Sequence, residues 1–281
     1  MKAIERIDHY ESTADYMAKC LANPDKDGSS HINTKQRNDW AGASLGDALK
    51  LQREGWSQRP DISKLANEID ISGSADLTEM VTEYSVQGSY VDVPTYLEGV
   101  PECMVEFVAQ PSPKVVRIGF NLSTGHQLSS QAFANRGAVI MAIYNKIASA
   151  GYSVEVVTYT ATSSVKRDGN KRITHKHCTS FVLKRSDQWM DEDELAFWCC
   201  HPAALRRCEF MHKESLPEEE RRAFGYYSGH GYGVPLDLAE FDEANEQMAL
   251  DCKVDFRSES FEAAVAYYNS TIEEINEKLA S

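Results

Sequence analysis

Long apolar runs are missing from this chain of 281 residues. No stretch approaches the roughly 20 consecutive apolar residues that a membrane-spanning helix requires. The first six residues, Met1 to Arg6, also lack the apolar centre of a secretory signal peptide. We therefore expect a cytoplasmic protein that has no membrane as a partner.

The sequence motifs of common enzyme classes are also missing. There is no Gly-x-x-x-x-Gly-Lys loop for phosphates and no Gly-x-Gly-x-x-Gly segment after a strand. Ser228 is followed by Gly-His-Gly and does not match the Gly-x-Ser-x-Gly motif of hydrolases. The three acids at 218–220 fit the solvated first turn of a helix that starts at Pro217. We expect no catalysis and no cofactor, and an unrecognised hydrolase is a third alternative.

Paired cysteines at metal-binding spacing are missing as well. The seven cysteines are an odd number at irregular spacings, which favours reduced thiols over a disulfide framework. One cluster could still hold a metal, because Cys208 and His212 are one helical turn apart. It also includes Cys199, Cys200 and His201. Since no Cys-x-x-Cys pair accompanies them, we predict buried thiols and no bound zinc.

Positive charge is scarce, with 29 Lys and Arg against 43 Asp and Glu and a net charge of −14. This balance disfavours non-specific binding of the whole surface to duplex DNA or anionic lipid. Any nucleic-acid site must therefore be local. From Asp237 to Ser281 the acids outnumber the bases by twelve to three, and the apolar spacing from Phe261 to Ile275 predicts an amphipathic helix.

The stretch that organises the rest of the chain runs from Val115 to Tyr159. A β-branched apolar run at 115–120 predicts a buried strand, and a polar segment follows it at 121–125. Apolar residues at helical spacing predict a helix from about Ser130 to Ala150, which Gly151 ends. A second strand then begins at Tyr152. Strand, helix and strand form a βαβ unit, so the fold class we predict is α/β, with parallel strands in the core and flanking helices.

The remaining segments predict additions to this core. Ile4, Ile7 and Tyr10 suggest a short helix, Ser44 can cap a helix that Gly55 closes, and the alternation from Thr82 to Val93 suggests a hairpin around Gly88. The boundaries we predict divide the chain into three parts of one compact unit. These parts are an N-terminal helical and hairpin elaboration at 1–110, an α/β core with a basic hairpin at 111–257, and an acidic C-terminal helix at 258–281.

The basic hairpin is the best functional signal in the chain. Segments 161–165 and 173–181 read as strands, and Asp168-Gly169 is a favoured two-residue turn between them. Five of the 29 basic residues fall within twelve positions here, against one acid. Charges that neutralise phosphates supply most non-specific nucleic-acid affinity. The predicted contacts on this hairpin are Lys166, Arg167, Lys171, Arg172, His175 and Lys176.

Tyrosines in the glycine-rich loop at 225–235 could add stacking contacts. Tyr226, Tyr227 and Tyr232 resemble in type the aromatic side chains on which single-strand binders stack bases. The alternative interpretation of the hairpin is a solvated ribbon whose charges keep it from aggregating. Because the two interpretations are equally consistent with the sequence, they remain open at this point.

The central unit resembles a von Willebrand factor A-type domain. That fold places an Asp-x-Ser-x-Ser metal loop after its first core strand, and here Asn121, Ser123 and Gly125 take the three ligand positions. An Arg-Gly-Ala segment at 136–138 matches the start of the following helix in that family. Since the loop offers one amide, one hydroxyl and no carboxylate, we predict no bound metal. The resemblance implies, as an alternative function, a protein–protein adaptor that has lost its metal site.

The wider pattern resembles uncharacterised proteins of tailed phages, through the segments 40–44, 53–56, 101–104 and 201–207. The chain is similar in size to the single-stranded-DNA-binding cofactors of phage RNA polymerases, although no motif of that group is matched. Our primary expectation is a non-catalytic protein that binds single-stranded DNA or RNA. Such a protein would act as a transcription or replication accessory factor with a phage RNA polymerase as partner, in the host cytoplasm. Self-association into a homo-oligomer stays open.

Overall fold

The computed structural model describes residues 2–22, 38–58, 78–111, 115–226, 232–238, 241, 250–252, 273 and 276–277. Its main sheet has the strand order β1-β7-β6-β5-β9, and β8 pairs with β6. Pairs β1–β7, β5–β6 and β5–β9 are parallel, while β6–β7 and β6–β8 are antiparallel. The strand bounds are β1 Glu5–Tyr10, β5 Val115–Asn121, β6 Ser153–Asp168, β7 Lys171–Lys184, β8 Val234–Pro235 and β9 Leu250–Cys252.

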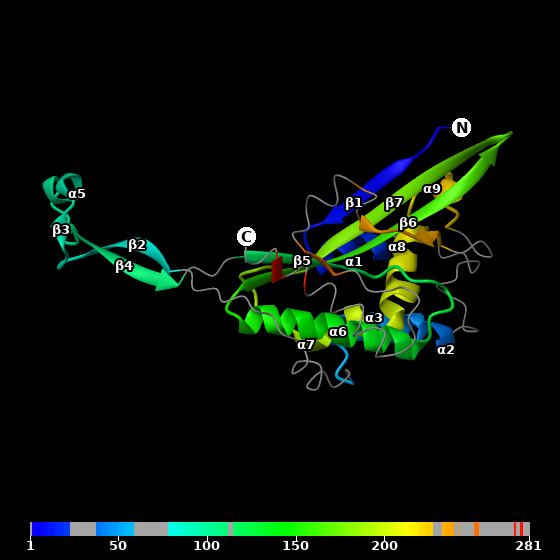
Figure 1. Ribbon diagram of the computed structural model, residues 1–281, viewed down its shortest axis with the longest axis horizontal. Coiled ribbons are helices and arrows are strands. Elements are labelled where there is room, and N and C mark those ends of the chain that lie inside the picture. Colours follow the sequence, from blue (N-terminus) through cyan, green and yellow to red (C-terminus); the bar gives the residue numbers. More distant parts are fainter. Residues whose placement is uncertain are drawn as a thin grey trace.

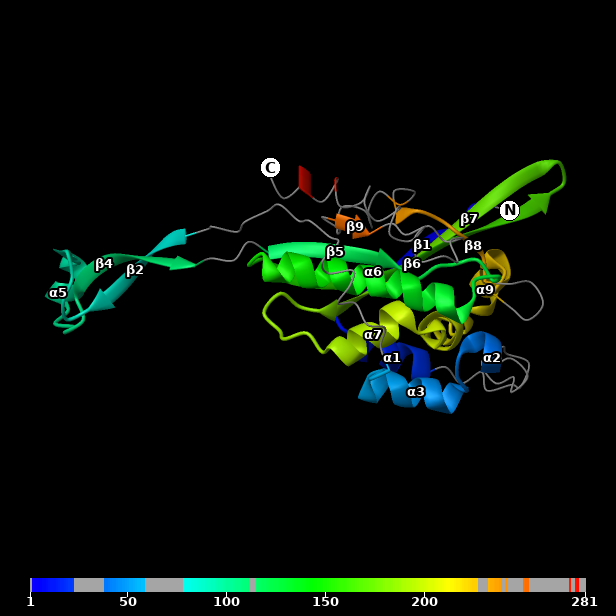
Figure 2. The same ribbon diagram turned by 60° about the horizontal axis from the view of Figure 1, so that its bottom comes forward.

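The main sheet and the helices packed on it form the body of the molecule. These helices lie on one side of the sheet in Figure 2, with α6 directly against it. None of the helices in the described residues is long and apolar enough to cross a membrane. Their bounds are α1 Thr13–Leu21, α2 Asn38–Ala41, α3 Leu45–Glu54, α6 Ser130–Ser149, α7 Glu192–Cys200, the π-helix η2 Ala204–Glu209, α8 Phe210–Glu214 and α9 Glu218–Phe224.

The central βαβ unit forms as its sequence pattern predicts. Strand β5 pairs in parallel with β6, and α6 connects them. Ser129 caps α6 by accepting a hydrogen bond from the Ala132 backbone N–H, which satisfies one of the free donors of the first turn. At the other end Gly151 has a φ of +92°, a conformation that favours glycine after a helix. The predicted α/β class, with a mixed sheet of mostly parallel strands and flanking helices, is confirmed.

Apolar side chains of β6 supply two cores because alternate residues face opposite sides of a sheet. Val154 and Val156 belong to the large core under the helices, together with Phe120 and Phe133. Tyr159 and its neighbours on the other face belong to a small core. Its members are Val157, Tyr159, Ala161, Cys178, Val182, Leu238 and Phe241.

Near the N-terminus the predicted helix is wrong. Residues Glu5–Tyr10 are strand β1, which pairs in parallel with Lys176–Phe181 of β7. The spacing of the apolar residues fits a helical face, but pairing with an available edge of the sheet decides the conformation, as tertiary context often does. Strand β1 therefore belongs to the same sheet as the core strands of the predicted segment 111–257.

Residues 78–111 form a second sheet, which stands apart from the body in both Figures 1 and 2. Its order is β2-β4-β3, and both pairings are antiparallel. The predicted hairpin of β2 with β3 is therefore wrong, because both strands pair with β4 instead of with each other. The bounds are β2 Thr78–Ser85, β3 Tyr90–Val91, α5 Val93–Leu97 and β4 Met104–Pro111.

Candidate nucleic-acid interface

Strands β6 and β7 continue beyond the rest of the sheet as a two-stranded ribbon. Strand β5 pairs with β6 only as far as Tyr159, and β8 pairs with it at Thr162 and Ser163. Strand β1 pairs with β7 from Lys176 onward. Among the described strands, therefore, none pairs with the ribbon outward of Ser163 and Lys176. Both views in Figures 1 and 2 show this ribbon projecting from the body.

A tight turn closes the ribbon one residue later than the sequence suggests. The strands end at Asp168 and restart at Lys171, so Gly169 and Asn170 form the turn. Gly169 has a φ of +59°, which a type II′ turn requires at its first central residue. The two predicted strands are confirmed, although the first is part of one continuous 16-residue strand that begins at Ser153.

The basic side chains of the ribbon are gathered at its tip. Arg167 lies directly opposite Arg172, while Lys171 lies opposite Asp168. Like charges at directly opposite positions destabilise an antiparallel pair. Among the described residues, no carboxylate forms an ion pair with Arg167, Lys171 or Arg172, and all three are exposed. The tip therefore carries positive charge at some cost to its own stability.

A groove runs between the outer part of the ribbon and helix α9. It has a volume of about 630 Å³. Its cations are Lys166, Arg167 and Arg222, and its acids are Glu218 and Glu219, with Ile4 and Ala223 completing the lining. Arg222 forms an ion pair with Glu218 one helical turn away, and both side chains are exposed. Such a pair contributes little and opens easily, so Arg222 can turn toward a phosphate.

Two other residues of the predicted set lie deeper than the tip. His175 is fully buried and its Nδ1 accepts a hydrogen bond from the Ile4 backbone N–H at 3.2 Å. Burial, followed by the nearby Lys166 ammonium, lowers the pKa of His175. The predicted phosphate contact by His175 is therefore wrong in this conformation. Lys176 is half-buried, with its Nζ 5.7 Å from the centroid of the Phe241 ring.

Two of the three predicted stacking tyrosines are core residues. Tyr226 is 1% exposed, and its hydroxyl lies 2.6 Å from Thr162 Oγ1. Tyr232 stacks on Phe210 with ring centroids 3.7 Å apart, and its hydroxyl donates to Glu214. Neither ring has a free face for a base, so the predicted stacking role is wrong for both. Tyr227 lies outside the described residues.

A buried polar network anchors the base of the ribbon. His177 Nε2 lies 3.1 Å from Asp8 Oδ2, and His177 Nδ1 lies 3.0 Å from the Tyr226 hydroxyl. Burial lowers the pKa of His177 to about 4, so the ring is neutral and donates from Nε2 to the carboxylate. Burial alone would raise the pKa of Asp8, but the hydrogen bonds from His177 and Arg6 bring it well below its usual value.

A second part of the network centres on Glu209, at the end of the π-helix. Its carboxylate accepts hydrogen bonds from the Tyr16 hydroxyl and from Thr160 Oγ1, each at 2.5 Å. Lys213 Nζ lies 3.9 Å from the same carboxylate and 5.1 Å from the centroid of the Tyr226 ring. Burial raises the pKa of Glu209 and lowers that of Lys213. These contacts tie β6 to α1 and η2, so the ribbon projects from a rigid base.

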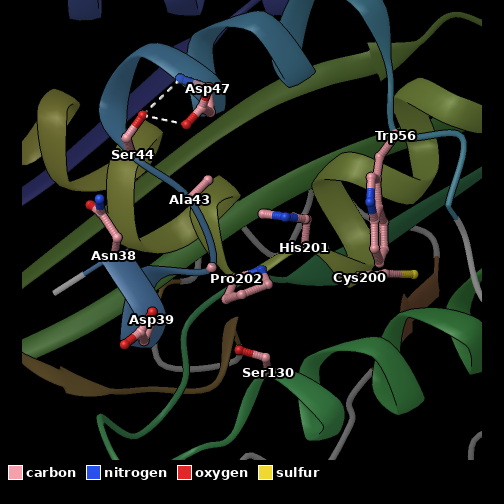
Figure 3. A pocket seen from close by; sticks show the side chains of 11 residues that line it. Asn38, Asp39, Ala43, Ser44, Asp47, Trp56, Ser130, Cys200, His201 and Pro202 are labelled. Carbon is pink, nitrogen blue, oxygen red and sulfur yellow. Dashed lines mark hydrogen bonds between the residues drawn. The ribbon is translucent and has the colours of Figure 1, made fainter.

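A separate cavity of about 480 Å³ lies beside His201 and Pro202 (Figure 3). His201 Nδ1 accepts a hydrogen bond from the Ala203 backbone N–H at 3.2 Å, and burial lowers the pKa of this imidazole to about 4. The described residues that line it include no Lys or Arg. The lining residues are Asn38, Asp39, Gly42, Ala43, Ser44, Asp47, Trp56, Ser130, Cys200, His201 and Pro202.

The possible zinc ligands point to different parts of the core. Cys200 Sγ lies 3.7 Å from Met141 Sδ, whereas Cys208 is packed near Cys20. His212 Nε2 lies 2.8 Å from the Tyr10 hydroxyl. Among the residues that the structure describes, no group of three or more His, Cys, Asp or Glu could hold a metal ion.

The loop after β5 is closed by its own hydrogen bonds. Asn121 Oδ1 accepts from the Ser123 backbone N–H at 2.8 Å, and Ser123 Oγ donates to the Ala161 carbonyl at 3.1 Å. The buried Arg136 guanidinium lies 3.4 Å from the carbonyls of Ser123 and Leu122. A fixed positive group beside the loop opposes a cation there. The loop does not cap α6 itself, because that role belongs to Ser129.

A family model covers nearly the whole of this α/β chain. It is described as "Domain of unknown function (DUF7192)" and matches residues 3–279. The chain belongs to the DUF7192 family. No match was found in the comparisons with curated proteins and with solved structures. The family match spans the main sheet, the ribbon and the second sheet together, and it adds no ligand or reaction.

Sequence reasoning missed two features of the interface. Arg222 is 50 positions from Arg172 in the sequence and joins the groove only because α9 packs beneath the ribbon. The Asp8–His177 contact connects residues 169 positions apart. A single sequence carries no signal for either contact, since the first depends on the packing of α9 against the ribbon and the second on the parallel pairing of β1 with β7.

Proposed function

We propose that this chain is a non-catalytic protein that binds single-stranded nucleic acid through the β6–β7 ribbon. The observation that carries the proposal is the exposed, like-charged tip, where Arg167 faces Arg172 on a ribbon that projects from an acidic protein. Exposed positive charge on a projecting ribbon attracts phosphates and releases their counterions on binding. The contacts we propose are Lys166, Arg167, Lys171 and Arg172, with Lys176 at the base and Arg222 across the groove.

The dimensions of the groove favour a single strand over a duplex. A volume of about 630 Å³ is of the order of a few nucleotides, and the groove is lined by side chains of both signs. A duplex would instead need the ribbon tip alone to enter a major groove about 12 Å wide. The expected role is a cytoplasmic accessory factor for transcription or replication, with a phage RNA polymerase as one partner.

The decisive experiment measures binding to a labelled oligothymidylate, a duplex of the same length and an RNA strand at several salt concentrations. Replacing Lys166, Arg167, Lys171 and Arg172 by Ala should weaken single-strand binding strongly. It should also flatten the slope of log affinity against log salt by up to about 3 units, at roughly 0.7 per phosphate. The fold should survive, because exposed surface changes usually cost less than about 0.5 kcal/mol.

A matched control removes four exposed bases away from the ribbon, by replacing Lys19, Lys50, Arg53 and Arg185 with Ala. This variant has the same net charge as the ribbon variant, so a loss of binding that the two share would reflect overall charge alone. Binding by the ribbon variant that equals the parent's at low salt would contradict the proposal.

The alternative function is a von Willebrand A-like adaptor that binds a protein and has lost its metal. The closed loop at Asn121–Gly125 and the guanidinium of Arg136 beside it favour this alternative. An adaptor has no need of a basic ribbon. If this chain binds a protein partner and has no affinity for any nucleic acid, that result would therefore support the adaptor over the primary proposal.

A further inference from the structure

The second sheet carries most of the exposed apolar surface of the described chain. Fourteen large apolar side chains are exposed in the described residues, and nine of them lie between Tyr84 and Phe107. Scattered apolar residues are normal on a surface, but such a concentration on one small unit marks an interaction surface. These nine are Tyr84, Val86, Tyr90, Val91, Val93, Tyr96, Leu97, Val100 and Phe107.

The same unit is strongly acidic. Residues 78–111 contain six Asp and Glu and no Lys, Arg or His. Glu83 lies directly opposite Glu106 in the β2–β4 pair, an arrangement of like charges that destabilises the sheet. A basic partner would relieve this repulsion. A second copy of the same acidic surface would increase it.

The two faces of this sheet differ in chemistry. Tyr84 and Tyr90 are both opposite Val105, so they share a face with Phe107, two residues further along β4. The rings of Tyr90 and Phe107 confirm this, with centroids 5.6 Å apart. Glu83 and Glu106 occupy the other face, because successive side chains of a strand alternate. One face is thus aromatic and the other acidic.

One edge of β4 is open over half its length. Strand β3 pairs with β4 only at Met104 and Val105. The Val105 carbonyl accepts from the Ser89 backbone N–H at 2.9 Å, so it points toward the β3 side. By strand alternation, the N–H and C=O groups of Phe107 and Ala109 point the same way, beyond the end of β3. Among the described strands, none pairs with them.

We propose that this open edge of β4 binds an extended segment of a partner protein in which apolar and basic residues alternate. The added strand places its apolar side chains beside Phe107 on the aromatic face and its Lys or Arg side chains beside Glu106 on the acidic face. Backbone hydrogen bonds to Phe107 and Ala109 supply affinity, and the two faces supply specificity, as in other cases of strand addition.

The chain's own basic ribbon cannot reach this edge. The second sheet connects to β5 through the three residues 112–114, and Val115 pairs with Ser153. Ser153 and the tip at Asp168 are the two ends of β6, a strand of 16 residues or about 50 Å at 3.3 Å per residue. The eight residues from Phe107 to Val115 span at most about 29 Å. The ribbon is therefore not the occupant, and the proposed occupant is a separate polypeptide.

The probe is a fluorescein-labelled, ten-residue peptide of alternating Lys and Val, titrated against the full-length protein by fluorescence anisotropy. We expect it to bind at least 10-fold more tightly than a peptide with five Lys followed by five Val. Hydrogen exchange should slow at the amides of Phe107 and Ala109. Equal binding of both peptides, or protection elsewhere, would overturn the proposal because charge alone would then explain the affinity.

Three variants test the edge and its two faces. Ala109→Pro removes the outward N–H, and proline is tolerated where an edge N–H faces solvent, so the fold should remain while binding falls at least 10-fold. Phe107→Ser should also reduce binding at least 10-fold. Glu83→Gln with Glu106→Gln should weaken it by about 3- to 10-fold, and Glu5→Gln with Asp187→Asn, two exposed acids of the body, should change it less than 2-fold.

Equal losses in the two acid-to-amide variants would assign binding to net charge and overturn the proposal. Unchanged binding by Ala109→Pro, with the native circular dichroism spectrum retained, would do the same. Sedimentation of the protein alone supplies a further readout. If the protein is a dimer and Ala109→Pro makes it monomeric, the occupant is a second copy of the chain and a basic partner is refuted.

Discussion

At the scale of single residues, two buried imidazoles make the fold sensitive to acid. The rings of His177 and His212 lie 6.1 Å apart and nearly parallel, and both are buried. Burial lowers their pKa values to about 4 and about 3. Protonation of either ring would place a cation near Lys213 inside the core. Asp8 stays ionised across the neutral range, since its pKa is well below the usual value.

The sign of the pH effect follows from these pKa values. Below about pH 6.5 these two imidazoles bind protons in the unfolded chain but not in the folded chain, so their contribution to stability is constant above that pH and falls below it. From pH 7 to pH 5 we expect these two rings to reduce the free energy of unfolding by about 2–4 kcal/mol, at up to roughly 1.4 kcal/mol per pH unit for each ring. Urea denaturation at pH 7.5, 6 and 5 checks this. His177→Gln should flatten the profile, and equal stability at pH 7.5 and pH 5 would contradict the assignment.

At the scale of elements, the like charges at the ribbon tip lower the stability of the ribbon and raise its proposed affinity for nucleic acid. Arg167 and Arg172 face each other across the two strands. Replacing Arg172 by Glu turns a repulsive pair into an attractive one, so stability should rise by about 0.2–1 kcal/mol. Affinity for single-stranded DNA should fall at the same time, because two units of positive charge leave the tip.

Thermal denaturation and anisotropy on the same preparation measure the two effects together. Arg172→Gln serves as the control, because it removes the repulsion without adding an acid, and it should give intermediate values in both assays. Binding and stability that fall together would mean that the ribbon is part of the folded core and that its charges have no separate role.

The elements that local patterns decide were predictable, and those that distant pairing decides were not. Helix α3 follows the expectation closely, from its Ser44 cap to Gly55, because capping is a local interaction. The basic ribbon was also predictable from alternation and a glycine turn. Strand β1 was not, since Ile7 lies beside Cys178 only after β7 has formed. Nor was the burial of Tyr226, because its neighbours come from β6 and β7.

At the scale of the whole molecule, charge of opposite sign is concentrated at opposite ends. The basic tip lies at one end of β6, and the acidic second sheet is attached beside the other end, as Figures 1 and 2 show. From the lengths of β6 and of the segment 107–115, and from the spacing of about 5 Å between β5 and β6, the tip and the open edge of β4 stay at least about 15 Å apart. That separation exceeds the Debye length of about 8 Å at physiological ionic strength.

The two proposed sites should therefore act independently. With a six-nucleotide oligothymidylate bound at saturation, the affinity for the alternating Lys/Val peptide should change less than 2-fold, and the same should hold in the reverse titration. Effects of substitutions at sites this far apart, with no shared contacts, normally add. When the ribbon variant is combined with Ala109→Pro, the protein should lose affinity for the oligothymidylate as much as the ribbon variant does. It should lose affinity for the peptide as much as Ala109→Pro does. A shift of more than about 5-fold in either titration would mean that the two sites are coupled and would contradict their independence.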